Sequence, residues 1–184
     1  TNDGMAYTTN VEKTWSNLFS EFSGSRYFEE ASIEIQKKVN KDLKLILNYI
    51  YTVYDQNLTG EGKDTVTAHT AIAEVQYKIS KTHSVRGELQ HLYTLSDRGS
   101  WVLALLEYSI SPNWFFAAFD EYNYGNDDSA KRIHYWNASM GYTRGANRVS
   151  IGYGKQRQGL LCVGGVCRNV PASNGLSLSI TSSF

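Results

Sequence analysis

The chain has 184 residues, with 18 basic and 18 acidic side chains and a formal net charge of zero. This length fits one domain or part of one, and the balanced charge shows no basic patch of the kind that binds nucleic acid. No run approaches the roughly 18 apolar residues of a transmembrane helix, although membrane-spanning strands need only alternate apolar residues. The chain opens at Thr1 without a signal peptide, so we expect a processed, trimmed or partial polypeptide.

Residues 1–24 form an N-terminal segment with the least regular pattern. Within it, Met5 to Glu12 are candidates for an extra strand, and residues 15–22 for a short amphipathic turn or an extracellular loop. From residue 25 to residue 184, apolar and polar residues alternate, which is typical of strands with two different faces. We predict nine strands there, at residues 27–39, 43–54, 66–79, 84–95, 100–110, 114–124, 131–143, 148–157 and 174–184.

Each predicted strand has one mainly apolar and one mainly polar face. In the strand at 84–95, for example, Val85 and Leu89 share one parity, whereas Arg86 and Glu88 share the other. The strand at 114–124 is apolar on both parities at its start. There we assign Phe115, Ala117 and Phe119 to the apolar face, because Asp120 then falls on the polar face.

The connections between the predicted strands alternate between short and longer segments. Residues 40–42, 80–83, 111–113 and 144–147 are short, whereas 55–65, 125–130 and 158–173 are longer. Residues 96–99 are the one exception, a short connection on the side of the longer ones. Outer-membrane barrels place short turns on the periplasmic side and longer loops outside. We therefore predict an all-β fold, an antiparallel up-and-down transmembrane β-barrel or the C-terminal part of a larger one, with nine or ten visible strands.

A soluble barrel such as a lipocalin is the competing interpretation. It would turn the apolar set inward and the polar set outward. The loop asymmetry would then be unexplained. So would the two groups of outward aromatic residues near opposite strand ends, which suit the two interfaces of a membrane.

The polar set is predicted to form a charge network in the lumen. Its members are Glu34, Lys44, Glu74, Lys78, Arg86, Glu88, Glu107 and Asp120. Opposite charges on neighbouring strands attract, so the network could simply brace a closed barrel. A polar pathway for small solutes is the alternative, which we favour less because barrels of roughly eight to ten strands fill with side chains, whereas wide pores need more strands.

An enzyme is not expected. His134 and Ser139 fall on opposite faces of one strand, His91 falls on the apolar face, and no G-x-S-x-G element occurs. The four histidines are scattered, and one C-x₄-C pair does not make a zinc site. We expect no metal and no cofactor.

The cysteine pair is the most specific local feature. Cys162 and Cys167 flank a Gly-Gly pair within the predicted loop 158–173. An external loop is an oxidising setting, so we predict a disulfide that stiffens it. With Lys155, Arg157 and Arg168 this loop could present a binding surface, or the three cations could meet anionic lipid head groups.

The last strand places Ile180 and Phe184 on its apolar face and ends on an aromatic carboxylate. This ending resembles the C-terminal signal of bacterial outer-membrane barrels. The resemblance implies that the barrel-assembly machinery reads these two residues during insertion.

Several stretches resemble an uncharacterised outer-membrane family of Bacteroidota over roughly residues 26–184. They are Tyr153-Gly-Lys-Gln-Arg157, Cys162-Val-Gly-Gly-Val-Cys-Arg168, Val170-Pro-Ala-Ser-Asn-Gly175, Arg26-Tyr-Phe-Glu-Glu30 and Arg132-Ile-His-Tyr135. Members of that family are longer, which implies additional strands upstream. In addition, the tripeptides around Thr65 and Ser129 resemble the O-glycosylation motif of Bacteroidota, and both lie in predicted outer loops.

The predicted location is the outer membrane of a Gram-negative bacterium. The expected role is a structural or interaction subunit of an outer-membrane protein assembly, and the alternative is a pore or transporter for small solutes. The expected partners are outer-membrane lipid and lipopolysaccharide, the barrel-assembly machinery, and other outer-membrane proteins or lipoproteins. No nucleic acid is expected.

Overall fold

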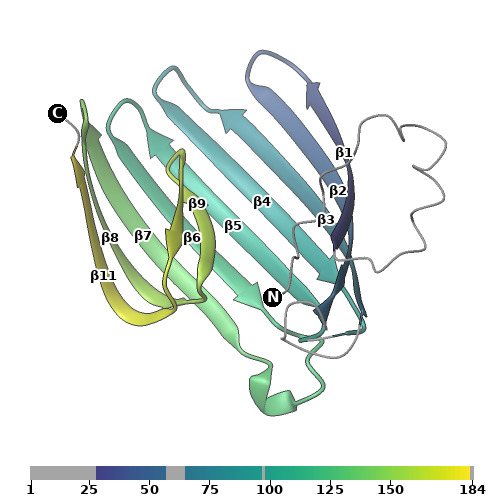
Figure 1. The fold of residues 1–184 in the computed structure, drawn as a ribbon. Helices are drawn as coiled ribbons and strands as arrows, with labels where there is room; N and C mark the ends of the chain where they lie inside the picture. Colours follow the sequence, from purple (N-terminus) through teal and green to yellow (C-terminus); the bar gives the residue numbers. More distant parts are fainter. Residues whose placement is uncertain (1–27, 57–64, 97, 183–184) are drawn as a thin grey trace, which may run out of the picture.

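The computed structural model describes residues 28–56, 65–96 and 98–182, and it is dominated by β-strands (Figure 1). Nine strands form one antiparallel sheet in the order β1-β2-β3-β4-β5-β6-β7-β8-β11, and β9 pairs with β10 in a separate hairpin. The strands are β1 Phe28–Lys38, β2 Leu43–Asp55, β3 Thr65–Lys78, β4 His83–Tyr93, β5 Trp101–Ile110, β6 Trp114–Tyr122, β7 His134–Arg144, β8 Asn147–Gln156, β9 Gly159–Val163, β10 Val166–Val170 and β11 Ser173–Ser182. Among the described residues, no helical segment is long and apolar enough to cross a membrane.

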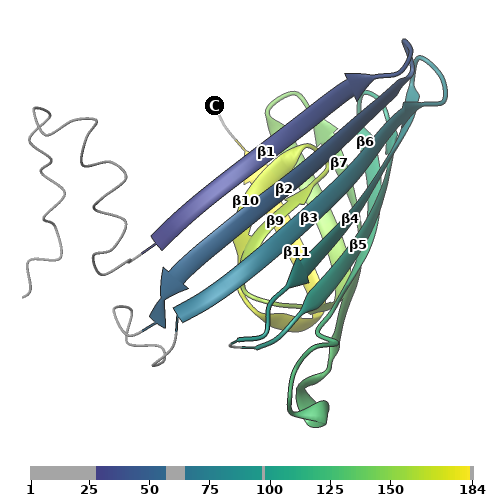
Figure 2. The same cartoon turned by 90° about the vertical axis from the view of Figure 1, so that its right-hand side faces the viewer.

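The main sheet is strongly curved, and the β9–β10 hairpin lies on its concave side (Figures 1 and 2). Consecutive strands are neighbours from β1 to β8, as in an up-and-down barrel, and β11 follows on the far side of β8. The sheet is not closed, because no pairing between β1 and β11 is present in the described part of the chain. The predicted all-β antiparallel fold is confirmed, but closure into a barrel is not observed.

One end of the sheet carries only short turns, and we call it the short-turn end. These turns span 39–42, 79–82, 111–113 and 145–146, and they lie at the upper end in Figure 1. The hairpin enters from the opposite end, where the connections are longer. The alternation of connection lengths that the sequence predicts is therefore present.

The nine predicted strands agree with the observed bounds to within three residues. The largest difference is at β7, which begins at His134 after a short 3-10 turn, η3 (Ser129–Lys131). The prediction of 158–173 as a loop is wrong, because these residues contain β9 and β10. The candidate strand at Met5 to Glu12 lies outside the described residues, as does Phe184.

The alternation of side chains gives the sheet a polar concave face and an apolar convex face. Cross-strand partners such as Gln76, Arg86 and Glu107 share the concave face, because residues directly opposite each other point to the same side. Large exposed apolar residues share the convex face, among them Ile33, Leu47, Val75, Leu89, Leu106, Phe116, Ile151 and Leu178.

The predicted orientation of β6 is wrong. Phe115, Ala117 and Phe119 are buried and face the concave side, whereas Phe116 and Ala118 are exposed on the convex side. Asp120 pairs in register with Ala104 and Trp136, so it belongs to the convex face. Both parities of β6 are apolar at its start, and each parity carries one carboxylate, Asp120 or Glu121. The prediction followed Asp120, which lies on the convex face.

Packing against the hairpin explains the burial of Phe115. The Arg148 guanidinium lies 4.2 Å from the centre of its ring, and the ring also covers Gly141 on the neighbouring strand β7. A Cβ atom at Gly141 would lie 2.1 Å from the ring atom Cε1 of Phe115. The absence of a side chain at Gly141 is therefore what lets this ring lie flat on the sheet.

We predict that Gly141→Ala destabilises the fold by about 1–3 kcal/mol, because the new methyl group would overpack against Phe115. Gly87→Ala is the matched control, since a Cβ atom there would meet nothing within 4 Å. Alanine should even stabilise that strand, by about 0.5–1 kcal/mol. Urea unfolding of the refolded protein in detergent micelles, followed by tryptophan fluorescence, measures both effects. Equal unfolding midpoints for the two variants would contradict the assignment of Phe115 to the concave face.

Candidate functional site: a disulfide hairpin clamped to the concave face

A cluster of charged side chains occupies the middle of the concave face. Arg86 on β4 lies beside Glu88 of the same strand, Glu74 of β3 and Glu107 of β5. Its Nη1 atom is 2.6 Å from a carboxylate oxygen of Glu88 and 3.2 Å from one of Glu74, and its Nη2 atom is 3.5 Å from Oε2 of Glu107. One guanidinium therefore bridges three strands and three carboxylates.

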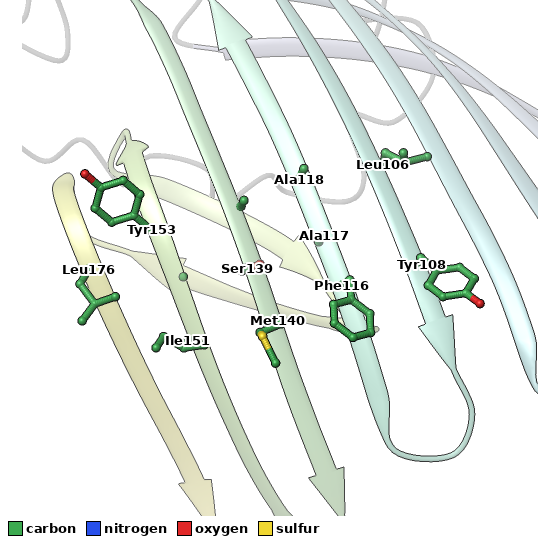
Figure 3. A pocket seen from close by; sticks show the side chains of 12 residues that line it. Leu106, Tyr108, Phe116, Ala117, Ala118, Ser139, Met140, Ile151, Tyr153 and Leu176 are labelled. Atoms are coloured by element: carbon green, nitrogen blue, oxygen red, sulfur yellow. The ribbon is translucent and has the colours of Figure 1, made fainter.

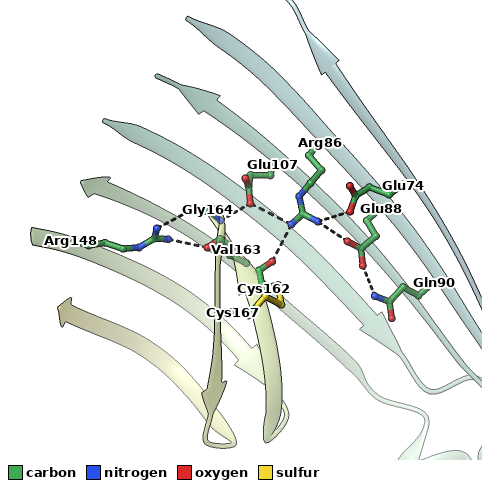
Figure 4. The surroundings of a disulfide bond; sticks show 10 residues. All are labelled: Glu74, Arg86, Glu88, Gln90, Glu107, Arg148, Cys162, Val163, Gly164 and Cys167. Atoms are coloured by element: carbon green, nitrogen blue, oxygen red, sulfur yellow. Dashed lines mark hydrogen bonds and ion pairs between the residues drawn. A yellow bond between two sulfur atoms is a disulfide. The ribbon is translucent and has the colours of Figure 1, made fainter. Parts of the chain in front are cut away.

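Glu107 links this cluster to the hairpin. Its side chain is buried, with a residue exposure of only 7%, and Oε2 accepts a hydrogen bond of 2.6 Å from the backbone N–H of Gly164 at the hairpin tip. Arg86 donates through Nη2 to the carbonyl oxygen of Cys162 at 3.1 Å (Figure 4). Burial of a carboxylate is unfavourable unless the group is paired. Arg86 and the N–H of Gly164 are the partners of the Glu107 carboxylate.

Arg148 on β8 holds the hairpin tip from the other side. It donates to the carbonyl oxygens of Gly164 and Val163, at 2.8 and 3.0 Å, while its guanidinium lies over Phe115. Gly164 adopts a φ of +62°, and a Cβ atom there would lie 2.4 Å from Arg148 Nη2 and 2.8 Å from the Phe115 ring. We call Arg86, Glu107 and Arg148 the hairpin clamp.

The predicted disulfide is confirmed. Cys162 and Cys167 are directly opposed across β9 and β10, with an S–S distance of 2.04 Å. The bridge closes the hairpin just before its Gly-Gly tip, so the short ladder is held both covalently and by backbone hydrogen bonds. It stiffens a hairpin that lies against the sheet, rather than the irregular loop that the sequence suggested.

The cations expected around this loop have partners on the protein. Arg157 forms an ion pair of 2.6 Å with Glu121 and lies over the Trp101 ring at 4.0 Å. Lys155 lies 5.0 Å above the Tyr135 ring. The side chain of Arg168 is outside the described part of the structure.

The predicted charge network is brought together only in part. Glu74, Arg86, Glu88 and Glu107 form the central cluster, whereas Glu34 lies on β1 and bonds to Gln36. Lys44 and Lys78 form no ion pair with the cluster, although they line a pocket at the short-turn end to which Arg86 and Glu107 also contribute. Asp120 does not belong to the network, because on the convex face it bonds at 2.7 Å to Nδ1 of His134.

Arg148 is the member of the clamp that the sequence pattern did not indicate. It lies at the start of β8, opposite Thr143 and Thr181, and its parity gives it a concave position. The sequence did contain one signal for a hairpin tip, which is the Gly-Gly pair midway between the two cysteines. Nothing in the sequence, however, relates residue 148 to residue 164 without the fold.

The candidate glycosylation residues lie at the surface, at the end with the longer connections. Thr65 is the exposed first residue of β3, and Ser129 is exposed in η3. The Asp128 carboxylate caps η3 by accepting a hydrogen bond from the N–H of Ala130 at 3.0 Å, and it lies 3.4 Å from Lys131 Nζ. Both contacts lower the pKa of Asp128, the hydrogen bond from Ala130 most.

The contacts of this site hold the hairpin against the sheet. Within the described ranges, no three His, Cys, Asp or Glu side chains gather in a way that could hold a metal ion. The charged groups of the clamp bind backbone groups of the hairpin. They therefore fix the disulfide-closed hairpin on the concave side of the sheet.

We predict that Arg148→Gln loosens the hairpin, because the charge-assisted bonds to the carbonyl oxygens of Val163 and Gly164 are lost. Each hydrogen bond to a charged group contributes about 1.5–3 kcal/mol, so local opening of residues 159–170 should become at least tenfold more frequent. Hydrogen exchange measured by mass spectrometry reports this opening. Arg144→Gln, an exposed arginine at the end of β7, is the control and should leave exchange unchanged. Unchanged exchange in Arg148→Gln would contradict the clamp.

The comparisons with known proteins agree with the resemblance at the level of the family. The model of the Family of unknown function (DUF6029) matches residues 2–184. No curated protein and no solved structure matches the chain. Origin in Bacteroidota and location in the outer membrane remain predictions. The match covers nearly the whole chain, and the chain therefore belongs to this family of unknown function.

Proposed function

We propose that this chain forms part of the wall of a transmembrane β-barrel in the outer membrane of a Gram-negative bacterium, and that it acts there as a structural or interaction subunit of an outer-membrane protein assembly. The observation that carries the proposal is the opposite polarity of the two faces of the sheet. A soluble protein that exposed so large a continuous apolar face would be prone to aggregate.

The convex face has the character of a lipid-facing wall. Leu89 and Leu106 lie in the middle of their strands and are 54% and 59% exposed. A shallow apolar groove of about 550 Å³ runs over β5 to β8 and β11, with Phe116, Met140 and Ile151 projecting from the sheet around it (Figure 3). In a bilayer, acyl chains would cover these surfaces.

The histidines of the convex face support the same interpretation, because one ring nitrogen of each has a partner. His69, His83 and His91 bond to the hydroxyl groups of tyrosines at 2.6, 2.6 and 2.5 Å, and His134 bonds to Asp120. A polar group that faces hydrocarbon without a partner costs several kcal/mol. Cross-strand pairs of this kind remove that cost.

Aromatic residues cluster toward both ends of the convex face. Tyr77, Tyr108, Trp114 and Tyr142 lie toward the short-turn end, whereas Tyr51, Tyr93, Tyr122 and Trp136 lie toward the other end. Tyrosine and tryptophan favour the interfaces of a membrane, where the ring is apolar and its polar tip is hydrated. The proposed orientation places the short-turn end in the periplasm.

The two edges of the sheet favour a subunit role. In the described residues, β1 pairs in the sheet only with β2, and β11 only with β8. Open sheet edges are not tolerated in the hydrocarbon region, because their backbone groups would lack partners. A barrel wall built from this sheet needs strands beside β1 and β11, and these must come from outside the described residues, either from this polypeptide or from a partner protein, which is the subunit role proposed.

The hairpin argues against a wide pore, because it lies in the space that the sheet curves around. The alternative of a pore for small solutes keeps one specific support, which is a pocket of about 400 Å³ that remains on the concave face at the short-turn end. Conductance in planar bilayers separates the two functions. Under the proposed function the native protein gives no channels above background, and discrete channels would favour the pore.

We predict that Leu89→Arg impairs membrane insertion, because an arginine on the lipid face near the bilayer midplane costs about 2–4 kcal/mol. Gln90→Arg is the matched control, since its side chain lies on the concave face near Glu88. The amount of each variant that is recovered folded in the native outer membrane, shown by the gel shift of the unboiled protein, measures both effects. Equal folding yields would argue against a lipid-facing convex side.

The subunit role is tested by extracting the protein from native outer membrane and determining its intact mass together with the proteins that elute with it. Photo-crosslinking residues at Ile33 in β1 and Ile180 in β11 should give protein adducts, because both strands lie at edges. The same residue at Ile151, in the interior of the sheet on the convex face, should not. A protein that elutes alone, without edge adducts, would contradict the subunit role.

A further inference from the structure

We propose that the concave face at the short-turn end binds a multivalent oxyanion, such as a phosphorylated solute. The site, which we call the lysine pocket, is formed by Lys38, Lys44 and Lys78 together with the hydroxyl groups of Ser84 and Ser109. It shares Arg86 and Glu107 of its lining with the hairpin clamp, but the proposed contacts to the anion come from other side chains. The proposal goes beyond the proposed function and rests on it only in that the protein is tested in lipid.

The cross-strand register brings the lysines together. Lys38 at the end of β1 lies directly opposite Lys44 at the start of β2, and Lys44 lies opposite Gln76, two residues before Lys78 on β3. Like charges directly opposite each other destabilise a sheet. Such a pair is therefore unfavourable unless something of opposite charge lies between the two side chains.

No ion pair within the described residues supplies that charge, although Asp42 of the β1–β2 turn also lines the pocket, together with a fourth lysine, Lys41. In the described part of the chain, none of Lys38, Lys44 and Lys78 forms an ion pair within 4.0 Å, whereas Arg86 of the same pocket is already paired with three carboxylates. Of the two acidic residues in the lining, Glu107 is occupied by Arg86 and by the N–H of Gly164, and Asp42 forms no ion pair with these lysines. Three ammonium groups remain available for a ligand.

The shape and chemistry of the lysine pocket suit an oxyanion. Its volume of about 400 Å³ falls within the range of about 300–1,000 Å³ that is usual for small-molecule sites. Ammonium groups form strong charge-assisted hydrogen bonds with phosphate, and serine hydroxyl groups and the Gln76 amide can add neutral ones. The concave position lowers the screening that a flat surface would suffer.

The test is isothermal titration calorimetry with inorganic pyrophosphate of the full chain, purified from native membrane together with the proteins that elute with it and placed in a zwitterionic lipid nanodisc. We expect saturable binding that weakens with ionic strength, and Lys44→Gln and Lys78→Gln should each weaken it by about tenfold or more, the loss expected for one charge-assisted bond. Lys37→Gln is the control, because Lys37 has the same charge but lies on the convex parity of β1. Absence of binding to the native protein, or equal weakening by Lys37→Gln, would overturn the proposal.

A second variant separates binding from folding. Lys38→Glu converts the like-charged pair with Lys44 into an opposite pair, so it should raise the unfolding midpoint while it weakens pyrophosphate binding. A variant that lowers both would indicate a structural role for Lys38 and overturn the site. The source of the anion follows from repeating the titration in nanodiscs with phosphatidylglycerol. Competition by the anionic lipid points to a lipid headgroup, and unchanged affinity points to a free solute.

Discussion

The carboxylate of Glu107 is the interaction on which the arrangement depends. It is buried in the middle of the concave face, and one of its oxygens meets both the Arg86 guanidinium and the N–H of Gly164. Removing a carboxylate from water is favourable only when charge and hydrogen bonds replace the lost solvent. The sheet provides the charge and the hairpin tip provides the hydrogen bond. Neither the sheet nor the hairpin alone would satisfy the Glu107 carboxylate. Its burial therefore couples the position of the hairpin to the curvature of the sheet.

The two faces of the sheet differ in polarity because charged and apolar side chains are separated onto opposite sides. Charged groups gather where they can bridge strands and meet the hairpin, and apolar groups gather on the other side, where nothing in the described chain covers them. The period of two in the sequence separates the two sets strand by strand. A barrel wall in a membrane would give each face a suitable surrounding, with lipid against the apolar convex face and a polar lumen against the charged concave face, which is the reason for the proposed membrane location. The open edges at β1 and β11 then become the places where such a wall must meet further protein.

Much of this fold could be predicted from alternation and turn residues alone, because the period is regular and the breaks are short and polar. The nine strands of the main sheet were found in this way, and so was the disulfide. Strand β6 could not be oriented, because Phe115 and Phe116 are equally apolar and only the hairpin decides which of them is covered. The hairpin itself was missed because its two strands have five residues each and no clear alternation. The partners of Arg148 are 15 and 16 residues further along the chain, and only the folded structure brings them within reach.

The clamp binds the hairpin almost entirely through main-chain atoms of the hairpin. The groups that it binds are the carbonyl oxygens of Cys162, Val163 and Gly164 and the N–H of Gly164, which any sequence of the same shape would offer. Selection on the clamp should therefore fall on Arg86, Glu107 and Arg148, and within the hairpin on Gly164, where a side chain would collide with Arg148 and Phe115. The outward-facing residues of β9 and β10 are left free to diverge. The hairpin can thus serve as a constant frame on which related chains vary what they display within the curved wall.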